Sequence, residues 1–441
     1  MKIRTRIAPS PTGMLHIGTA RAALFNYLFA RKNGGQFLIR IEDTDLARNN
    51  AESYDSIVDG LAWLGMKSDE EIVYQSQRND FYKKQIEILI NSGKAYYSHI
   101  PEEEMEKRKE DAIKNNTRHI HRYSGEDDFK TDAKPVVRLK VQPNVDIVIN
   151  DLIQGQVTIN TNTIEDFIIA RSDGTPVYML AVVCDDIAME ISHVIRGVDH
   201  LSNTAKQILI YNAFGVQLPV FAHMPLIHGS DGSKLSKRHG AVATVEYRKQ
   251  GYLPEAMRAY LLRLGWGTSH DNILNDDEAI KEFSLEGVGK SPSQFDFVKL
   301  QSVNEHFIKN SENEHLQKVL AEEYGFNFEK ILNPIMAINL VKNRSKTLLE
   351  LQENLMLFKK EMPKVEIAQE KLKFLQKFME SVNENDDLHG KFQEYLKENN
   401  VKFKDIGPDF RMVLIGTASS IAIFDVIAVL GFEEAKNRIL A

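Results

Sequence analysis

Apolar and polar residues follow two different patterns in the first and the second part of this chain. Up to about residue 245, short apolar runs typical of buried strands alternate with segments in which apolar residues recur at helical spacing. Beyond Val245 the helical spacing dominates. This order predicts an α/β domain built on a parallel sheet, followed by all-α domains.

The first strand, loop and helix occupy residues 5–35. An apolar strand start is followed by a loop rich in Pro and Gly, and Asn33-Gly34-Gly35 marks the end of the helix. We expect His16 at the start of this helix, where Gly18 leaves space for a flat base. Unpaired backbone N–H groups and the positive end of the helix dipole attract phosphate at such a place. The unit predicts a phosphate site, with an ordinary βα turn as the alternative.

Further elements follow from the same patterns. We expect strands at residues 36–41, 136–141, 146–159, 179–183, 191–200 and 220–227. We expect helices at residues 51–64, 81–90, 102–115, 201–214 and 254–264, and five or six amphipathic helices after about Asn310. Glu42, Asp43 and Asp45 come at the end of the second strand, which is where ligands bind in doubly wound sheets.

A second stretch suited to phosphate lies between residues 229 and 238. It is a loop of Gly and Ser that ends in three cations, Lys234, Lys237 and Arg238. Alone, this pattern is typical of a solvated basic loop. Together with the first helix, it gives the chain two segments that can hold the phosphates of one nucleotide.

Both stretches resemble those of a known family. The segment His16-Ile17-Gly18-Thr19 resembles the first signature of the class I aminoacyl-tRNA synthetases, and residues 234–238 resemble the second. Residues 6–13 and 40–45 are similar to the glutamyl branch of that family. Thr19 stands where the common signature has a second histidine, which leaves a single imidazole in the motif.

The resemblance is specific as far as about Lys309, and it implies an architecture. It implies a Rossmann-type, doubly wound parallel sheet that is split by an α+β insertion and followed by all-α domains. The implied parts are a catalytic domain at 1–94 and 187–245, an acceptor-end-binding insertion at 95–186, stem-contacting helices at 246–309, and an anticodon-binding region at 310–441.

The resemblance also implies the site residues. Those implied for catalysis are His16, Lys234 and Lys237, and those for ATP are Gly13, His16, Gly18, Thr19, Lys234, Leu235, Ser236 and Lys237. Those implied for glutamate are Arg6, Ser10, Glu42, Tyr178 and Arg196. Arg6 has an alternative role, which is an ordinary ion pair with Glu42 or a neighbouring aspartate. Val182 departs from the asparagine of some relatives, so one hydrogen bond to the substrate is in doubt.

The basic cluster 342–346 lies in the helical region and contains Arg344. We expect Arg344 to contact tRNA, although such a cluster at a helix end is more often simply solvated.

The implied activity is the attachment of glutamate to tRNA(Glu) through a glutamyl-adenylate. It uses ATP and Mg²⁺ and releases AMP and pyrophosphate, and catalysis would rest on positioning and electrostatic stabilisation. Charging of tRNA(Gln) stays open. The alternatives are a relative that glutamylates a tRNA base, a small-molecule nucleotidyltransferase, and an inactive tRNA-binding protein. The region past Asn310 disfavours the first two, and intact His16 and Lys237 disfavour the third.

Composition narrows the setting of the protein. The net charge of −7 disfavours a general nucleic-acid binder, so tRNA contact would need a local basic face. The single cysteine, Cys184, excludes an internal disulfide. With an N-terminus unlike a signal peptide, it predicts a cytoplasmic protein. We expect a monomer, because nothing in the sequence demands a dimer.

Two segments invite other interpretations. Residues 412–432 are apolar enough to suggest a membrane anchor, but Asp425 interrupts them, so we expect a pair of buried helices. His99, His119 and His121 lie in a segment without cysteine. Structural zinc sites rely on thiolates, so we expect surface histidines and no zinc.

Overall fold

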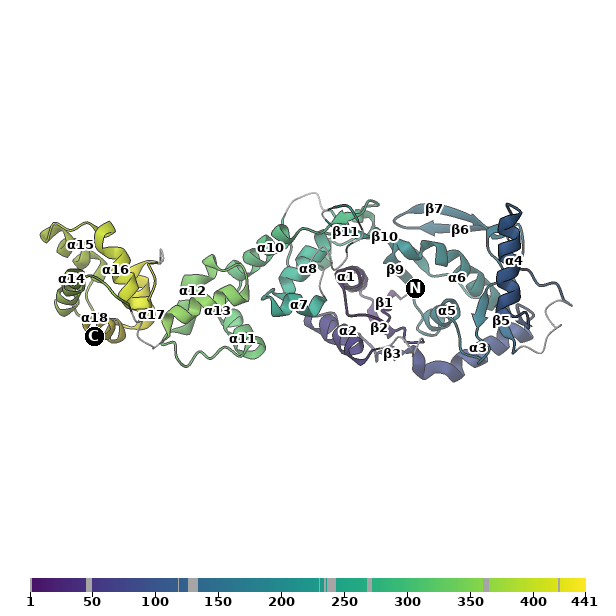
Figure 1. Ribbon diagram of the computed structural model, residues 1–441, viewed down its shortest axis with the longest axis horizontal. Helices are drawn as coiled ribbons and strands as arrows, with labels where there is room; N and C mark the ends of the chain where they lie inside the picture. Colours follow the sequence, from purple (N-terminus) through teal and green to yellow (C-terminus); the bar gives the residue numbers. More distant parts are fainter. Residues whose placement is uncertain are drawn as a thin grey trace. The chain divides into compact units, whose positions relative to one another are not determined.

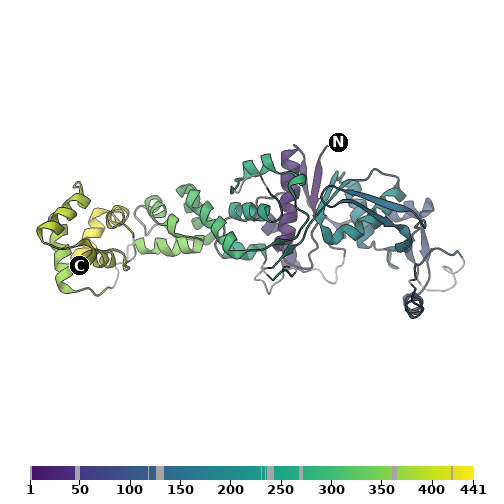
Figure 2. The same ribbon diagram turned by 90° about the horizontal axis from the view of Figure 1, so that it is seen from above.

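The computed structural model describes residues 2–44, 50–117, 119–125, 134–229, 231–233, 235, 243–267, 272–359, 365–418 and 421–441. The chain forms two compact units. The first contains Met1–Tyr247 and Met257–Phe297, and the second contains Arg248–Ala256 and Val298–Ala441. Figure 1 shows the elements with their labels, and Figure 2 shows the same chain from above.

A largely parallel sheet forms the centre of the first unit. Three strands pair in the order β1 (Arg4–Ile7), β2 (Gln36–Ile41) and β3 (Val73–Tyr74), all parallel. Four more pair in the order β7 (Gly155–Asn160), β6 (Asp146–Asp151), β10 (Val220–Met224) and β9 (His193–Gly197). Strand β10 runs parallel to both of its neighbours, whereas β6 and β7 form the antiparallel hairpin seen along one edge in Figure 1.

The two groups of strands meet at the start of β1 and β9. The backbone N–H of Arg4 donates to Ser192 Oγ at 2.8 Å, and the backbone N–H of Ser192 donates to the Arg4 carbonyl at 3.0 Å. Strand β6 lies within the residues assigned to the insertion, yet it pairs with β10. The predicted α/β class with a parallel sheet is therefore confirmed, whereas the domain boundaries remain a prediction.

Helices and a second sheet surround this centre. The helices are α1 (Ile17–Lys32), α2 (Ala51–Trp63), α3 (Asn79–Asn91), α4 (Glu102–Lys114), α5 (Tyr178–Ala188), α6 (Leu201–Phe214) and α9 (Asp276–Glu282). The antiparallel sheet contains β4 (Ala95–Ser98), β5 (Val136–Leu139) and β8 (Ile168–Ala170). Two short strands, β11 (Ile227–His228) and β12 (Ser293–Gln294), pair in parallel.

Strand β2 shows why the sheet is stable. Phe37, Leu38 and Ile39 are almost completely buried although successive side chains point to opposite faces. Burial on both faces is typical of a central parallel strand that helices cover on each side. A Phe-to-Ala change at such a site costs about 3–5 kcal/mol. Arg40 is the exception within this apolar run, because it is charged and fully buried.

The structure corrects the strand expected at residues 179–183. This segment belongs to α5, which begins at Tyr178 and ends at Ala188. A short run that is apolar on every side fits a buried helix as well as a buried strand, so periodicity alone could not separate them. The helical repeat of 3.6 residues places Tyr178, Val182 and Asp186 on one face.

The second unit is helical. Helices α7 (Thr244–Lys249), α8 (Pro254–Arg263) and α10 (Phe297–Asn310) cross the boundaries between the units. The rest are α11 (Asn313–Tyr324), α12 (Pro334–Val341), α13 (Leu348–Leu355), α14 (Gln369–Glu380), α15 (Leu388–Glu398), α16 (Phe403–Ile415), α17 (Ile423–Leu430) and α18 (Phe432–Leu440). These are eight helices among the described residues rather than five or six. Several have only about two turns, too short for a periodic pattern to separate them from their neighbours.

The structure bears out the expectation for residues 412–432 and corrects the one for His121. The apolar stretch at 412–432 forms the end of α16 and the whole of α17, and the inward residues of both are buried, as expected. No helix among the described residues is long and apolar enough to cross a membrane. His121 is buried rather than on the surface, and its Nε2 lies 3.0 Å from the Tyr96 hydroxyl. The expected lack of zinc remains a prediction.

Candidate active site

The start of α1 holds His16 as the residue that caps the helix. Its Nδ1 accepts the backbone N–H groups of Gly18 at 3.1 Å and Thr19 at 3.4 Å. Nδ1 is therefore unprotonated, and in the neutral ring Nε2–H donates to Thr19 Oγ1 at 3.1 Å. Thr19, which replaces the second histidine of the common signature, thus orients the imidazole of His16. The structure also corrects one expectation, because two of the helix N–H groups are not unpaired.

Glycine at position 18 has a steric reason. A Cβ added there would lie 3.1 Å from Cε1 of His16. The side chain would crowd the imidazole and disturb the cap. The first turn of α1 carries no acidic residue, so its positive dipole end suits an anion. Gly13 and Ser10 are exposed in the loop before it.

The second signature lies mostly outside the described residues. Lys234, Ser236, Lys237 and Arg238 fall there, as does Asp45. The described residues next to the loop are nevertheless placed. The backbone N–H of Leu235 donates to the Ile227 carbonyl at 3.1 Å.

The chain beyond this loop returns to the head of α1. Ala243 pairs with His16 as an isolated β-bridge, and the backbone N–H of Thr244 donates to the Leu15 carbonyl at 2.8 Å. Thr244 Oγ1 donates to the same carbonyl at 3.0 Å. The end of the loop is thereby anchored beside His16, although more than 200 residues separate the two segments in the sequence.

A buried cluster of charges lies at the ends of β1 and β2 and along α5. Arg40 Nη1 donates to Asp186 Oδ1 at 2.6 Å, and Arg40 Nη2 donates to Glu42 Oε1 at 2.9 Å. Arg6 donates to both oxygens of Asp186, from Nε at 3.1 Å and from Nη2 at 3.3 Å. Arg6 therefore makes the ion pair with a neighbouring aspartate that the sequence left as an alternative.

The pKa shifts in this cluster follow from burial and charge. Burial raises the pKa of Glu42, and Arg40 opposes this only in part. For Asp186, burial acts in the same upward direction, but Arg40 and Arg6 outweigh it and hold the pKa below its usual value. Asp186 is therefore ionised, and it is the anion that orients both arginines.

Arg196 has a different environment. It lies on β9 and is buried. Its Nη2 donates to Thr204 Oγ1 at 2.8 Å and to Gln207 Oε1 at 2.7 Å, and its Nε donates to His223 Nε2 at 3.1 Å. No carboxylate of the described residues lies within ion-pair distance of it. Burial accordingly lowers the pKa of Arg196.

Besides Arg40 Nε, which lies 3.8 Å from Asp185 Oδ2, three atoms of these side chains make no hydrogen bond to any described residue. They are Nη1 of Arg6, Nη1 of Arg196 and Oε2 of Glu42. Tyr178 is close to these atoms, since the charges of Glu42, Arg196 and Arg6 all affect the pKa of its hydroxyl. Burial raises the pKa of Tyr178 to about 12, Glu42 adds to this, and Arg196, Arg6 and Arg40 oppose it. The arrangement presents two donors and one acceptor within a single polar site.

Sequence reasoning missed several residues of this site. Asp186 had a signal, since two adjacent aspartates end an apolar run. His223 also had one, because a histidine interrupts a buried strand. Thr204 and Gln207 had none, since their positions on α6 depend on how that helix packs. Val182, which replaces the asparagine of some relatives, is buried one turn after Tyr178.

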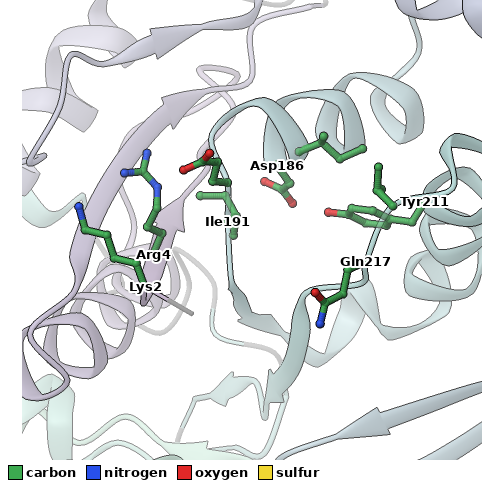
Figure 3. Close-up of a pocket in the computed structure, with 9 residues that line it drawn as sticks. Lys2, Arg4, Asp186, Ile191, Tyr211 and Gln217 are labelled. Carbon is green, nitrogen blue, oxygen red and sulfur yellow. The ribbon is translucent and has the colours of Figure 1, made fainter.

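A cavity of about 350 Å³ is also lined by Asp186 of this cluster. Figure 3 shows Lys2 and Arg4 on one side of it and Asp186 and Tyr211 on the other. Lys2 precedes β1 and Gln217 precedes β10, so the cavity is at the amino ends of the strands. Ligands of open α/β sheets bind at the carboxyl ends, so we do not assign a substrate to it.

Arg344 occupies an exposed position in the second unit. It ends a short 3₁₀-helix, Lys342–Arg344. Lys342 Nζ donates to the Ser311 carbonyl at 2.8 Å, which fixes the start of this turn. Burial lowers the pKa of Arg411, and the charge of Arg344 lowers it further, so the two cations are neighbours.

Comparison with known proteins gives a consistent result. Residues 2–302 match the family model described as tRNA synthetases class I (E and Q), catalytic domain. Residues 297–441 match the model of an anticodon binding domain.

Individual relatives cover the whole chain. The chain is 43% identical to a glutamate–tRNA ligase 2 of Wolbachia pipientis over 100% of this chain and 99% of the relative. It is 42% identical to a glutamate–tRNA ligase 2 of Rickettsia akari over 99% and 98%. A crystal structure of a glutamate tRNA ligase from Elizabethkingia meningosepticum in complex with its amino acid is similar, with a TM-score of 0.84 and 30% identity over 100% and 99%.

Proposed function

This chain belongs to the class I (E and Q) tRNA synthetase family, and we propose that it attaches glutamate to tRNA(Glu) at the expense of ATP. The reaction has two steps. The α-carboxylate of glutamate attacks the α-phosphate of ATP, which forms glutamyl-adenylate and releases pyrophosphate. A hydroxyl of the terminal ribose of tRNA then attacks the adenylate, and AMP leaves.

The observation that carries the proposal is the set of unbonded atoms in the buried site. Nη1 of Arg6 and Nη1 of Arg196 are two donors on cations, and Oε2 of Glu42 is one acceptor on an anion. Glutamate carries two carboxylates and one ammonium group. Its charged groups therefore match the available atoms in both number and sign.

We assign the side-chain carboxylate of glutamate to Arg196. Arg6 is already neutralised by Asp186, whereas Arg196 donates only to neutral acceptors among the described residues. A glutamine amide would bring no negative charge and would point its own donors at the guanidinium. Unpaired buried polar groups of this kind reject an analogue by about 10⁴-fold or more.

The ATP site would be formed by the head of α1 and the loop of the second signature. His16 and the dipole of α1 face anions from one side, and Lys234 and Lys237 would add cations from the loop that is anchored beside His16. Mg²⁺ would arrive with ATP and neutralise phosphate charge. The chain needs no protein nucleophile for either step.

The remaining parts would hold tRNA. We propose that residues 95–186 bind its acceptor end, that 246–309 contact its stem, and that 310–441 read its anticodon, with Arg344 at a phosphate or base. We also propose that the protein is a cytoplasmic monomer, and light scattering of the purified protein tests the monomeric state. The anticodon model match argues against the base-glutamylating alternative.

The deciding experiment is glutamate-dependent ATP–pyrophosphate exchange, with and without tRNA, followed by aminoacylation of separate tRNA(Glu) and tRNA(Gln) transcripts. We expect exchange with glutamate and not glutamine, and charging of tRNA(Glu). Charging of tRNA(Gln) as well would make the enzyme non-discriminating. Binding of tRNA without exchange would instead mean an inactive tRNA-binding protein.

A further inference from the structure

Behind Arg196 lies a chain of buried hydrogen bonds that no substrate atom would touch. His223 on β10 and Asp151 on β6 are both fully buried as side chains. His223 Nδ1 lies 2.5 Å from Asp151 Oδ2, and His223 Nε2 lies 3.1 Å from Nε of Arg196. The three residues come from three neighbouring strands of the sheet.

The chemistry of Arg196 fixes the tautomer of His223. An arginine Nε always carries a proton and can only donate. His223 Nε2 must therefore be the acceptor and carry no proton, so the proton of the neutral ring lies on Nδ1 and is donated to Asp151 Oδ2. Burial lowers the pKa of His223, which favours this neutral form.

We propose that Asp151 and His223 are positioning residues that hold the guanidinium of Arg196 so that Nη1 is directed at the carboxylate of glutamate. This rests on the proposed function and deepens it. Thr204 and Gln207 hold Nη2 from the other side. His223, Thr204 and Gln207 together accept from every nitrogen of the Arg196 guanidinium except Nη1. They therefore fix the orientation of this planar group.

Asp151 allows a sharp test, because its two oxygens have different tasks. Oδ1 accepts three backbone N–H groups, those of Ile153 at 3.0 Å, Gln154 at 2.8 Å and His223 at 3.1 Å. In Asp151→Asn the amide oxygen must keep this position, because only an oxygen accepts these bonds. The amide NH₂ then replaces Oδ2 and faces His223 Nδ1.

That exchange would reverse the tautomer. An NH₂ opposite Nδ1 requires Nδ1 to accept, so the proton moves to Nε2, which can then donate to Thr204 Oγ1 at 3.0 Å. Nε2 no longer accepts from Arg196 Nε, so the guanidinium loses the hydrogen bond that holds this edge. Because a hydrogen bond to a charged group is lost, we expect the KM for glutamate to rise roughly 10- to 100-fold. Since ground-state and transition-state binding are lost together, kcat and the KM for ATP should change little.

A matched control is Asp166→Asn. Asp166 is also a buried carboxylate that accepts backbone N–H groups, from Tyr123 at 2.8 Å and Val141 at 2.9 Å. It is not bonded to Arg196 or its partners. If both variants raise the KM for glutamate equally, the effect is general destabilisation and the positioning role is refuted. An unchanged KM in Asp151→Asn refutes it as well.

A second measurement is independent of activity and of the Asp151→Asn variant. Long-range ¹H–¹⁵N NMR of the full-length wild-type protein, labelled in its histidine rings, reports which ring nitrogen carries the proton; His223→Gln assigns the signal. We expect the neutral Nδ1–H form at pH 7. An Nε2–H or doubly protonated ring would overturn the proposal. Absence of glutamate-dependent exchange in the wild type would overturn the proposed function instead.

Discussion

Arg6 and Arg196 offer the same chemical group to the site, yet their replacement should have different consequences. Arg6→Ala removes a cation whose charge Asp186 already balances, whereas Arg196→Ala removes a cation without an acidic partner among the described residues. We therefore expect Arg196→Ala to affect glutamate binding more, and Arg6→Ala to affect the stability of the fold more.

The expected rise in the KM for glutamate follows from the hydrogen bonds that each arginine can make. Nη1 of Arg196 has two N–H groups, and each charge-assisted bond to a substrate carboxylate contributes about 1.5–3 kcal/mol. Losing both corresponds to a rise of about 10²–10⁴ in the KM for glutamate, at about 1.4 kcal/mol per factor of ten. Arg6 acts within a neutral pair, so its loss should cost about 0.5–1.5 kcal/mol of binding, or roughly 2- to 13-fold.

Stability should follow the opposite order. Removing one partner of a buried ion pair costs about 3–5 kcal/mol when the other is left without compensation. In Arg6→Ala the carboxylate of Asp186 keeps its 2.6 Å bond to Arg40, so we expect a smaller cost, about 1–3 kcal/mol. Arg196→Ala leaves only neutral groups behind.

Two assays separate these effects. ATP–pyrophosphate exchange with glutamate and with glutamine, in the presence of tRNA, gives the KM values and the discrimination, and thermal unfolding gives the stability. An equal loss of glutamate affinity in Arg6→Ala and Arg196→Ala would contradict the different roles of the two arginines. Full discrimination against glutamine in Arg196→Ala would mean that the side-chain carboxylate is bound elsewhere.

Three further predictions concern other parts of the chain. Lys237→Ala should slow adenylate formation by about 10²–10³-fold or more with little change in the KM for glutamate, because we propose that this cation stabilises the leaving phosphates. Exchange at a near wild-type rate would mean that the segment is only a surface loop. Arg344→Ala should raise the KM for tRNA and make binding less sensitive to salt in filter-binding titrations; an unchanged salt slope would place Arg344 away from RNA. Because burial lowers the pKa of His193, His200 and His223, the unfolded chain binds more protons than the native one below about pH 6.5. Thermal stability should therefore fall as the pH drops through this range, and a melting temperature that rises instead would contradict the assignment.

The sequence predicted the outline of the fold because local patterns decide it. The first strand and helix were found within a residue or two, since an apolar run, a Pro/Gly loop and Asn33-Gly34-Gly35 all indicate the same unit. The run at residues 179–183 failed, because burial on all sides removes the contrast by which a helix and a strand are told apart. The short helices beyond Asn310 were undercounted because each provides too few turns.

The site was predictable only in part, because local patterns do not show which distant segments come together. Signatures identified residues that would face ligands, such as His16, Glu42 and Arg196. Their supporting partners come from distant segments, and their roles depend on pairing across the sheet. Asp151 reaches Arg196 through His223 because β6 and β9 both lie next to β10. No local pattern contains that information.

The balance of buried charge links these observations to the choice of substrate. Three arginines, Arg6, Arg40 and Arg78, lie in ion pairs with three carboxylates, Glu42, Asp185 and Asp186, although the side chain of Arg78 is 27% exposed. Arg196 has no carboxylate partner among the described residues, and burial of an unpaired cation is costly. The side chain of glutamate would bring a carboxylate to this cation, whereas that of glutamine would bring a neutral amide. We therefore expect the site to favour the acidic amino acid, and we expect this preference not to depend on which tRNA is bound.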